Sequence, residues 1–242
     1  MNTTVLLMQK KAPDNQALAK ALKSQWKVPM DSLTITDKTL VFNTIGGITV
    51  MIAYLDYPAA TDETGAAARL SWIWKNGTDV AMRHQATMVV SVIGPFAKTL
   101  ELYKILTQTT AAVCEATQAA AVFQQSQYLL LSSDYFISAA RNMVANQTLP
   151  LYCWVYFGRP GDGNGFTLGM VEFGLPEMEI AASEHPEAEV HATLYDAALT
   201  VLKYHSKLAD GSTLTTEEGT ALPVKIGKSA FLEEQTVIKL SY

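Results

Sequence analysis

Residues 158–180 read GRPGDGNGFTLGMVEFGLPEMEI, a stretch that combines spaced glycines with two prolines, four acidic residues and short apolar runs. Spaced glycines hold phosphate groups when they connect a strand to the first turn of a helix. Here the residues after the glycines, 166–173, have the apolar pattern of a strand. Asp-Gly and Asn-Gly between two strands favour a tight turn, because these residues tolerate positive φ. We therefore predict a hairpin at 158–180, with a ligand-binding loop as the alternative.

The chain on either side of this hairpin alternates between helical and extended patterns. Apolar residues recur at three- and four-residue steps in 100–114 and 190–208, which predicts two amphipathic helices. β-Branched and aromatic runs bounded by turn residues predict strands, and the main runs of this kind are 5–8, 33–36, 39–44, 48–55, 86–93, 149–157 and 166–173. Such spacing is typical of antiparallel pairs, so we predict an α+β fold with two sheet-plus-helix lobes, 1–118 and 119–242, in one compact unit.

The composition is that of a well-buried globular protein. Hydrophobic residues make up 49% of the 242 residues and charged residues 17%, which argues against disorder. The longest apolar runs are much shorter than the roughly 20 residues of a membrane span. Residues 1–9 lack the basic start of a secretory signal. We therefore expect a cytoplasmic protein that does not interact with a membrane.

The net charge of −5 hides an uneven distribution of charged residues. Residues 160–202 contain eight acidic residues and no Lys or Arg, whereas residues 1–159 carry 13 basic and 10 acidic residues. Phosphate contacts need clustered basic residues, so the acidic segment argues against a nucleic-acid partner. A basic protein is the partner that complements it. A homodimer or scaffold whose acidic residues only confer solubility is the plainer alternative.

Four acidic residues of this segment are predicted to share one partner-binding surface: Glu177, Glu179, Glu187 and Asp196. Strand side chains alternate between the two faces of a sheet. Glu177 and Glu179 therefore point to solvent if the apolar residues that alternate with them point inward. Glu187 and Asp196 are predicted to lie opposite the apolar stripe of the following helix.

The alternative function is a small-molecule-binding or hydrolytic enzyme with a site in the cleft between the two lobes. His84, Asp162 and His191 are its candidate acid–base groups, but the chain has no Gly-x-Ser-x-Gly motif for a serine nucleophile. The histidines lack the spacing of a zinc site, and the glycine-rich stretch lacks the glycine and glutamate positions of a calcium loop. Cys114 and Cys153 fit neither a disulfide framework nor a catalytic pattern. We expect no metal, no cofactor and two buried, reduced thiols.

Three segments resemble a known family: HQATMVVSVIG (84–94), LPLYCWVYF (149–157) and GFTLGMVEFGLPEMEI (165–180). They are similar to the bacterial family described as domain of unknown function 4261 (DUF4261). In that family a Leu-Pro-x-x-x-Trp-Val segment precedes a Thr-x-Gly-Met or Thr-x-Gly-Leu strand and a Phe-Gly-x-x-Glu-x-Glu-Ile ending. The matching residues here are Leu149, Pro150, Trp154, Val155, Thr167, Gly169, Met170, Phe173, Gly174, Glu177, Glu179 and Ile180.

The resemblance is strongest over 149–226 and weaker upstream, so it places the DUF4261-like motif in the C-terminal lobe. It implies no reaction, cofactor or catalytic residue. It implies a bacterial cytoplasmic protein and, by analogy, a link to interbacterial toxins and their immunity or secretion partners. Together with the charge distribution, it favours a non-enzymatic module that binds a basic toxin or secretion-associated protein through an acidic face, as an immunity protein would.

Overall fold

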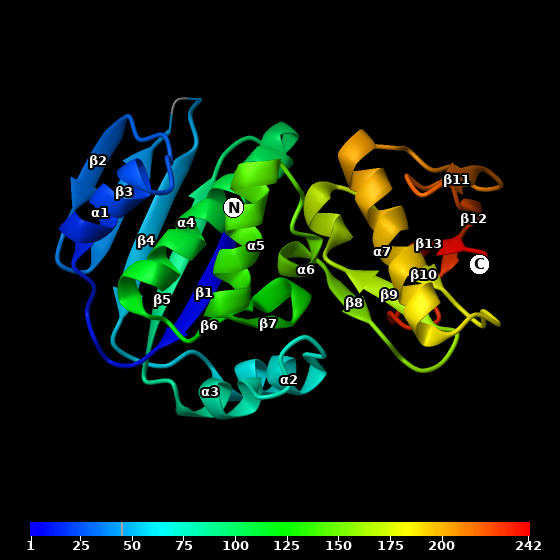
Figure 1. Ribbon diagram of the computed structural model, residues 1–242, viewed down its shortest axis with the longest axis horizontal. Helices are drawn as coiled ribbons and strands as arrows, with labels where there is room; N and C mark the ends of the chain where they lie inside the picture. The colour runs from blue at the N-terminus through cyan, green and yellow to red at the C-terminus, as the bar shows by residue number, and fades with distance from the viewer. Residues whose placement is uncertain (45) are drawn as a thin grey trace. The chain divides into compact units, whose positions relative to one another are not determined.

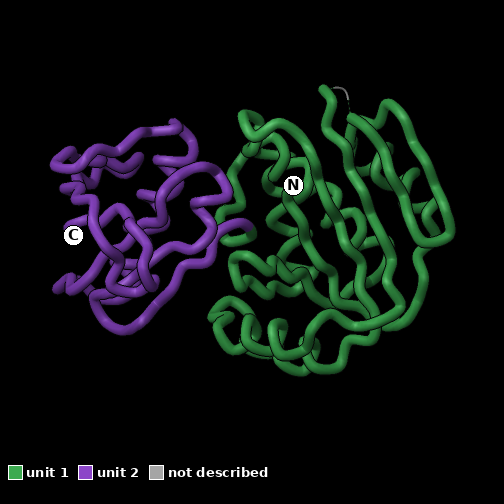
Figure 2. Tube along the Cα trace, turned by 180° about the vertical axis from the view of Figure 1, so that it is seen from behind, with its two compact units in different colours: residues 1–153 green, residues 154–242 purple. Residues whose placement is uncertain are grey.

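The structure is a computed structural model that describes residues 1–44 and 46–242 (Figure 1). Within these residues the chain forms two compact units, Met1–Cys153 and Trp154–Tyr242 (Figure 2). Each unit combines helices with a sheet, and the strand pairs are mainly antiparallel. The predicted α+β class is therefore confirmed.

The first unit begins with a strand and alternates strands with helices along its length. Its elements are β1 (Asn2–Met8), α1 (Asn15–Ser24), β2 (Ser32–Ile35), β3 (Thr39–Asn43), β4 (Thr49–Leu55), α2 (Thr61–Leu70), α3 (Gly77–Arg83), β5 (Ala86–Ile93), η1 (Phe96–Lys98), α4 (Thr99–Thr117), β6 (Ala121–Gln124), η2 (Gln125–Gln127), β7 (Leu129–Ser132), α5 (Ser133–Asn146) and α6 (Leu151–Trp154), which ends at the boundary between the units. Asp14 starts α1 and Ser132 starts α5, because each side chain accepts hydrogen bonds from N–H groups of the first turn.

The described strands of the first unit form one antiparallel sheet in the order β2-β3-β4-β5-β1-β6-β7. α1, α4 and α5 pack against one face of this sheet (Figure 1). On that face Leu6, Ile52 and Val90 are fully buried and form the main core. The core therefore lies between the sheet and these three helices.

The second face of this sheet is covered differently along its width. At the β6–β7 end, α2 and α3 pack on it, and Leu7, Phe123 and Leu130 form a buried cluster with alanines of these helices. Over β2, β3, β4 and β5, the side chains that alternate with the core residues form a surface that we call the outer face. Two of its residues, Met51 and Ile93, are 37% and 44% exposed.

The second unit is a smaller sheet with one long helix. Its elements are β8 (Tyr156–Gly158), β9 (Gly165–Leu168), η3 (Met170–Phe173), β10 (Met178–Ile180), α7 (Glu187–Tyr204), β11 (Thr213–Thr215), β12 (Ala221–Lys228) and β13 (Thr236–Leu240). The strand order is β11-β12-β13-β10-β9-β8, and β10 pairs in parallel with β13 and antiparallel with β9. α7 packs on β9 and β10, where Val190, Leu194 and Val201 are buried. This is the apolar stripe predicted for 190–208.

The hairpin predicted at 158–180 is present as the antiparallel pair β8–β9, which closes around the glycine-rich turn. The predicted strand at 166–173 ends early, because Gly169 has a φ of 126° and the chain then enters η3. The strand predicted at 149–157 is also wrong over its first half. There the N–H of Cys153 donates to the carbonyl of Pro150 at 2.8 Å, and the chain makes the short helix α6 before β8 begins.

The boundary between the two units differs from the predicted division into 1–118 and 119–242. β6 and β7 come after residue 118, but β6 pairs with β1 and brings Phe123 opposite Val5. Both strands therefore belong to the first sheet, and the division falls after Cys153. Pairing between strands more than 100 residues apart leaves no local pattern in the sequence, which is why periodicity placed the boundary too early.

Candidate functional site

The carboxylate of Glu177 is buried, with the residue only 1% exposed, and it binds backbone N–H groups rather than a cation. Its Oε1 accepts hydrogen bonds from the N–H groups of Gly169 at 2.7 Å and Val171 at 3.3 Å. Its Oε2 accepts the N–H of Met170 at 3.2 Å and the hydroxyl of Thr167 at 2.7 Å. Buried charges need such hydrogen-bond partners, so this carboxylate ties η3 to the end of β9.

The local sequence explains why a carboxylate is needed at this point. The first N–H groups of a helix have no partner within the helix, and a negative charge near them is favourable. Gly169 precedes η3 and has no side chain with which to cap it. Glu177 supplies the missing acceptor from eight residues further along the chain, and Thr167 and Gly169, two other residues of the family motif, complete the network.

Glu179 is equally buried, at 1% exposure, and organises the loop between β12 and β13. Its Oε1 forms an ion pair with Lys239 at 2.9 Å. Its Oε2 accepts the hydroxyl of Ser229 at 2.6 Å and the N–H of Ala230 at 3.1 Å. Sequence reasoning missed Ser229 and Lys239, because both lie about 50 residues or more beyond their partner.

The prediction that Glu177 and Glu179 point to solvent is therefore wrong. Alternation does place these residues opposite Met178 and Ile180, but all four are buried. β10 lies inside the sheet between β13 and β9 and is covered on both sides. A strand buried on both faces has no solvent side to which alternating residues can point.

The other two predicted partner-binding residues do not share a surface either. Glu187 and Asp196 are both half-buried on α7. They are nine residues apart, which is about two and a half helical turns, so they lie on opposite sides of the helix. Asp196 accepts the N–H of Glu218 at 3.4 Å, whereas Glu187 forms an ion pair with Arg159 at 2.5 Å. The four predicted residues therefore do not form one acidic face.

A different set of exposed acidic residues lies on and beside two neighbouring loops, one between β8 and β9 and one between β10 and α7. The N–H of Ser183 donates to the carbonyl of Gly163 at 2.9 Å, and the N–H of Ala182 donates to Oδ1 of Asn164 at 2.9 Å. Gly163 has a φ of 71°, and a Cβ there would lie 2.2 Å from the carbonyl oxygen of Ser183. Only glycine permits this approach, so the turn glycine joins the two loops.

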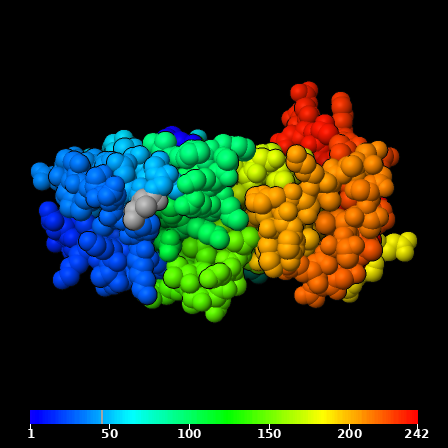
Figure 3. Space-filling view, turned by 90° about the horizontal axis from the view of Figure 1, so that it is seen from above, coloured from blue at the N-terminus to red at the C-terminus, as the bar shows by residue number. Residues whose placement is uncertain are grey.

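We call the exposed carboxylates of these loops and of the first turn of α7 the acidic rim: Asp162, Glu184 and Glu189. The residues before α7, drawn in yellow, project from the surface in Figure 3. Glu189 also contacts His185, with 3.1 Å between Oε2 and Nδ1, and the His185 ring stacks on Tyr242 at 4.2 Å. The rim is therefore an exposed surface whose backbone is held by several interactions.

The charge asymmetry of the chain follows the division into units. The second unit contains 13 acidic and six basic residues, a net charge of −7, whereas the first unit contains 10 acidic and 12 basic residues, a net charge of +2. Two of the 13 acidic residues, Glu177 and Glu179, are buried. The acidic surface of the second unit is thus carried by the other residues, including the rim.

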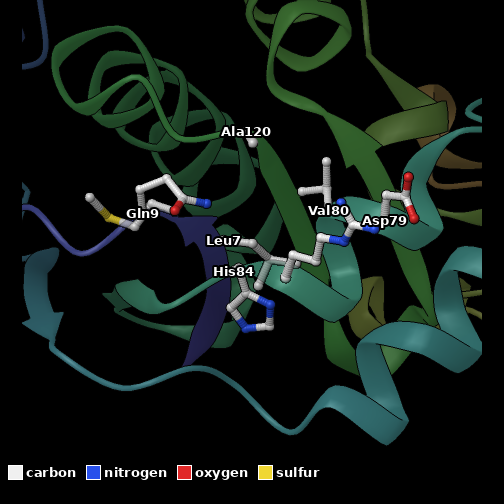
Figure 4. A pocket seen from close by; sticks show the side chains of 8 residues that line it. Leu7, Gln9, Asp79, Val80, His84 and Ala120 are labelled. Atoms are coloured by element: carbon white, nitrogen blue, oxygen red, sulfur yellow. The ribbon is translucent and has the colours of Figure 1, made fainter.

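His84 lines a cavity of about 200 Å³ in the first unit, beside Leu7, Gln9 and Asp79 (Figure 4). Both of its ring nitrogens are already used. Nε2 accepts the N–H of Ala59 at 2.9 Å, and Nδ1 lies 2.8 Å from the carbonyl of Ala81, to which it must donate. This assigns a neutral ring, and burial lowers the pKa of His84. His84 therefore has no free nitrogen for the predicted acid–base role.

We expect His84 to make the stability of the first unit dependent on pH. Its pKa is lowered in the folded state, so the unfolded chain takes up a proton first as the pH falls below about 6.5. The free energy of unfolding therefore decreases as the pH falls from about 6.5 toward the lower pKa that His84 has in the folded state. Urea denaturation of wild type and His84→Gln from pH 7 to pH 5 measures this, and the stability difference between them should shrink as the pH falls. A constant or growing difference would contradict the assignment.

The remaining candidate acid–base groups, His191 and Asp162, lie in the second unit. His191 is half-buried on α7, with its ring 5.6 Å from that of Phe157. Burial lowers the pKa of His191, Arg159 lowers it further, and Glu187 opposes the shift. Asp162 is exposed in the glycine-rich turn. His84 belongs to the first unit.

The described residues also bear on metal, membrane and thiol chemistry. Within 1–44 and 46–242, no group of three or more His, Cys, Asp or Glu side chains is placed to hold a metal ion. None of the helices in this described part of the chain has the length and apolar character of a membrane span. Cys114 and Cys153 are free and buried, as expected. Burial raises the pKa of Cys114 to about 12 and also raises that of Cys153, which keeps both thiols protonated.

Comparison with known proteins finds a family match within the second unit. Residues 166–241 match the family described as Domain of unknown function (DUF4261). No curated protein and no solved structure matches the chain. The matched residues run from β9 through β13 and include the Glu177 and Glu179 networks, whereas the similar segments at 84–94 and 149–157 lie outside the match. The second unit therefore contains a DUF4261 match at residues 166–241, and the rest of the chain lies outside that match.

Proposed function

We propose that this chain is a non-enzymatic protein-binding module and that its second unit binds a basic protein through the acidic rim. The observation that carries the proposal is that two joined loops and the first turn of α7 hold Asp162, Glu184 and Glu189 at the surface on a fixed backbone. Loops fixed before binding lose less conformational freedom when a partner docks. This proposal replaces the four-residue surface expected from the sequence. It keeps the idea that acidic side chains bind a basic protein.

The electrostatics of the unit support a basic partner. A net charge of −7 on one unit attracts a basic protein at long range and raises its association rate. The same charge repels phosphate groups, so a nucleic acid is not the proposed partner. A cytoplasmic basic toxin or secretion-associated protein is the partner class that we propose, and an immunity protein is the corresponding role for this chain.

The described pockets favour binding over catalysis. His84 in the first-unit cavity is held by two backbone groups. In a second pocket, between the end of α7 and β11, Glu217 accepts hydrogen bonds from Lys203 at 2.5 Å and from the Tyr204 hydroxyl at 2.7 Å. In each pocket one titratable side chain, His84 or Glu217, is thus held by structural hydrogen bonds, which supports a non-enzymatic role.

The test reverses the charge of the rim. The triple variant Asp162→Lys, Glu184→Lys and Glu189→Lys should bind a basic protein encoded beside this chain's gene with an association rate about tenfold or more lower at low salt. Its rate should also depend less on salt, because the long-range attraction is what salt screens. Stopped-flow or surface-based kinetics at low and moderate salt measures both effects.

The matched control makes the same change of net charge elsewhere in the second unit. Glu218→Lys, Glu233→Lys and Glu234→Lys replace three exposed acidic residues outside the rim loops. If net charge alone matters, the association rate and its salt dependence decrease equally in both triple variants, and the rim is not the binding surface. If the wild-type chain binds no such basic protein, the proposed function is wrong.

A further inference from the structure

We propose that two copies of this chain associate through the outer faces of their first sheets. The proposal goes beyond the acidic rim, because it uses the first unit and a surface without charge. The central row of the outer face runs across four strands as Thr34, Val41, Met51 and Ser91, each opposite the next, although Ser91 itself is only 2% exposed. Ala53, Val89 and Ile93 flank this row on the same side of the sheet. None of these positions holds a charged residue.

This composition differs from that of a solvated sheet face. A one-sided antiparallel sheet usually alternates apolar residues toward the core with polar residues toward water. Here the core side is apolar as expected, but the outer side combines valine, alanine, methionine and isoleucine with hydroxyl side chains. Met51 and Ile93 remain 37% and 44% exposed. Covering these apolar groups would be favourable, by about 25 cal/mol for each Å² removed from water.

The absence of charge on the outer face favours a second copy over a charged partner. In a two-fold dimer the same surface patch meets itself, so any charged residue near the axis would meet one of its own sign. A neutral face avoids this repulsion. A strongly acidic or basic partner would find no complementary charge there, and the net charge of the first unit is only +2.

The size and shape of the face also fit a dimer. Each outward residue of a sheet occupies about 33 Å² of flat area, from a two-residue repeat of about 6.8 Å and a strand spacing of about 4.8 Å. A dozen such positions on β2–β5 and the start of β1 thus cover roughly 400 Å² on each copy. Two copies would therefore cover roughly 800 Å² of flat area in total, which is below the roughly 1,000–1,200 Å² of small specific interfaces and is the size of a weak association. We therefore expect a reversible, concentration-dependent dimer in which two sheets stack face to face.

The test measures the mass of the full chain in solution. Sedimentation velocity and light scattering from micromolar to submillimolar concentration should show wild type passing from monomer to dimer. Met51→Lys and Ile93→Lys, alone or together, should shift the dissociation constant at least tenfold toward monomer, because they place like charges across the interface. Val144→Lys is the matched control, since Val144 is 43% exposed and lies on α5, away from the outer face.

A mixing experiment separates lost contact from lost folding. Met51→Glu and Met51→Lys should each be monomeric with unchanged circular dichroism, and an equimolar mixture of the two should dimerise again, because the opposite charges now attract. The proposal is overturned if wild type stays monomeric at all concentrations. It is equally overturned if the outer-face variants dimerise like wild type, if Val144→Lys is as disruptive as they are, or if the mixture of folded variants stays monomeric.

Discussion

Replacing Glu177 with alanine is expected to destabilise the second unit by about 3–5 kcal/mol. The change removes one acceptor and leaves the N–H groups of Gly169, Met170 and Val171 without it in a buried space. An unsatisfied buried donor costs about 1–3 kcal/mol, and the cavity left by the side chain adds to that cost. Urea denaturation measures the loss, and hydrogen exchange of peptides covering residues 165–180 shows where it acts.

Two controls identify the carboxylate as the cause. Glu177→Gln keeps the shape and one acceptor oxygen, so it should lose part of the stability that the alanine variant loses. Glu172→Ala removes a half-exposed acid of η3 whose carboxylate has no hydrogen-bond partner among residues 1–44 and 46–242, and it should change stability by no more than about 0.5 kcal/mol. Equal stability of Glu177→Ala and wild type would show that the buried network does not stabilise the unit.

Gly163→Ala is expected to cost the second unit about 3 kcal/mol or more. A Cβ at this position would lie 2.2 Å from the carbonyl oxygen of Ser183, and backbone cannot move aside as a side chain can. The φ of 71° adds strain for any residue other than glycine. The change also breaks the hydrogen bond from the N–H of Ser183 to residue 163, so the two loops of the acidic rim separate.

Gly161→Ala is the matched control for this prediction. Gly161 lies in the same turn and also has a positive φ, 129°, but a Cβ there meets nothing within 4 Å. It shares the conformational cost, about 1–3 kcal/mol, without the clash. Thermal denaturation should therefore rank wild type above Gly161→Ala, and Gly161→Ala above Gly163→Ala. If the two variants have the same melting temperature, the contact between the loops has no energetic role. The fixed rim on which the proposed function rests then loses its support.

The elements that the sequence predicts correctly are those defined by neighbouring residues. The strands at 33–36, 39–44 and 48–55 appear as β2, β3 and β4, and the stripe at 190–208 appears as α7. Asp-Gly and Asn-Gly placed the β8–β9 turn correctly, because positive φ is a local property of these residues. The family motif also contains Glu177 and Glu179, the two buried carboxylates of the second unit, although the resemblance assigned them no role.

The predictions that were wrong concern which side chains are buried by other elements. Short-range sequence patterns do not contain this information. Glu177 and Glu179 alternate correctly with apolar residues, yet they are buried because β13 and β9 flank their strand and both of its faces are covered. The acidic rim likewise depends on the contact between Gly163 and Ser183, which lie on separate loops.

The sequence by itself therefore determined the α+β class, the helical stripe, the hairpin and the concentration of acid in the second half of the chain, because each follows from composition or short-range periodicity. Only the tertiary structure decided which acidic residues reach solvent, where the first sheet ends, and that the outer face over β2–β5 stays partly exposed. These features depend on which elements lie against one another, and that is set by strand pairing and packing between residues far apart in the chain.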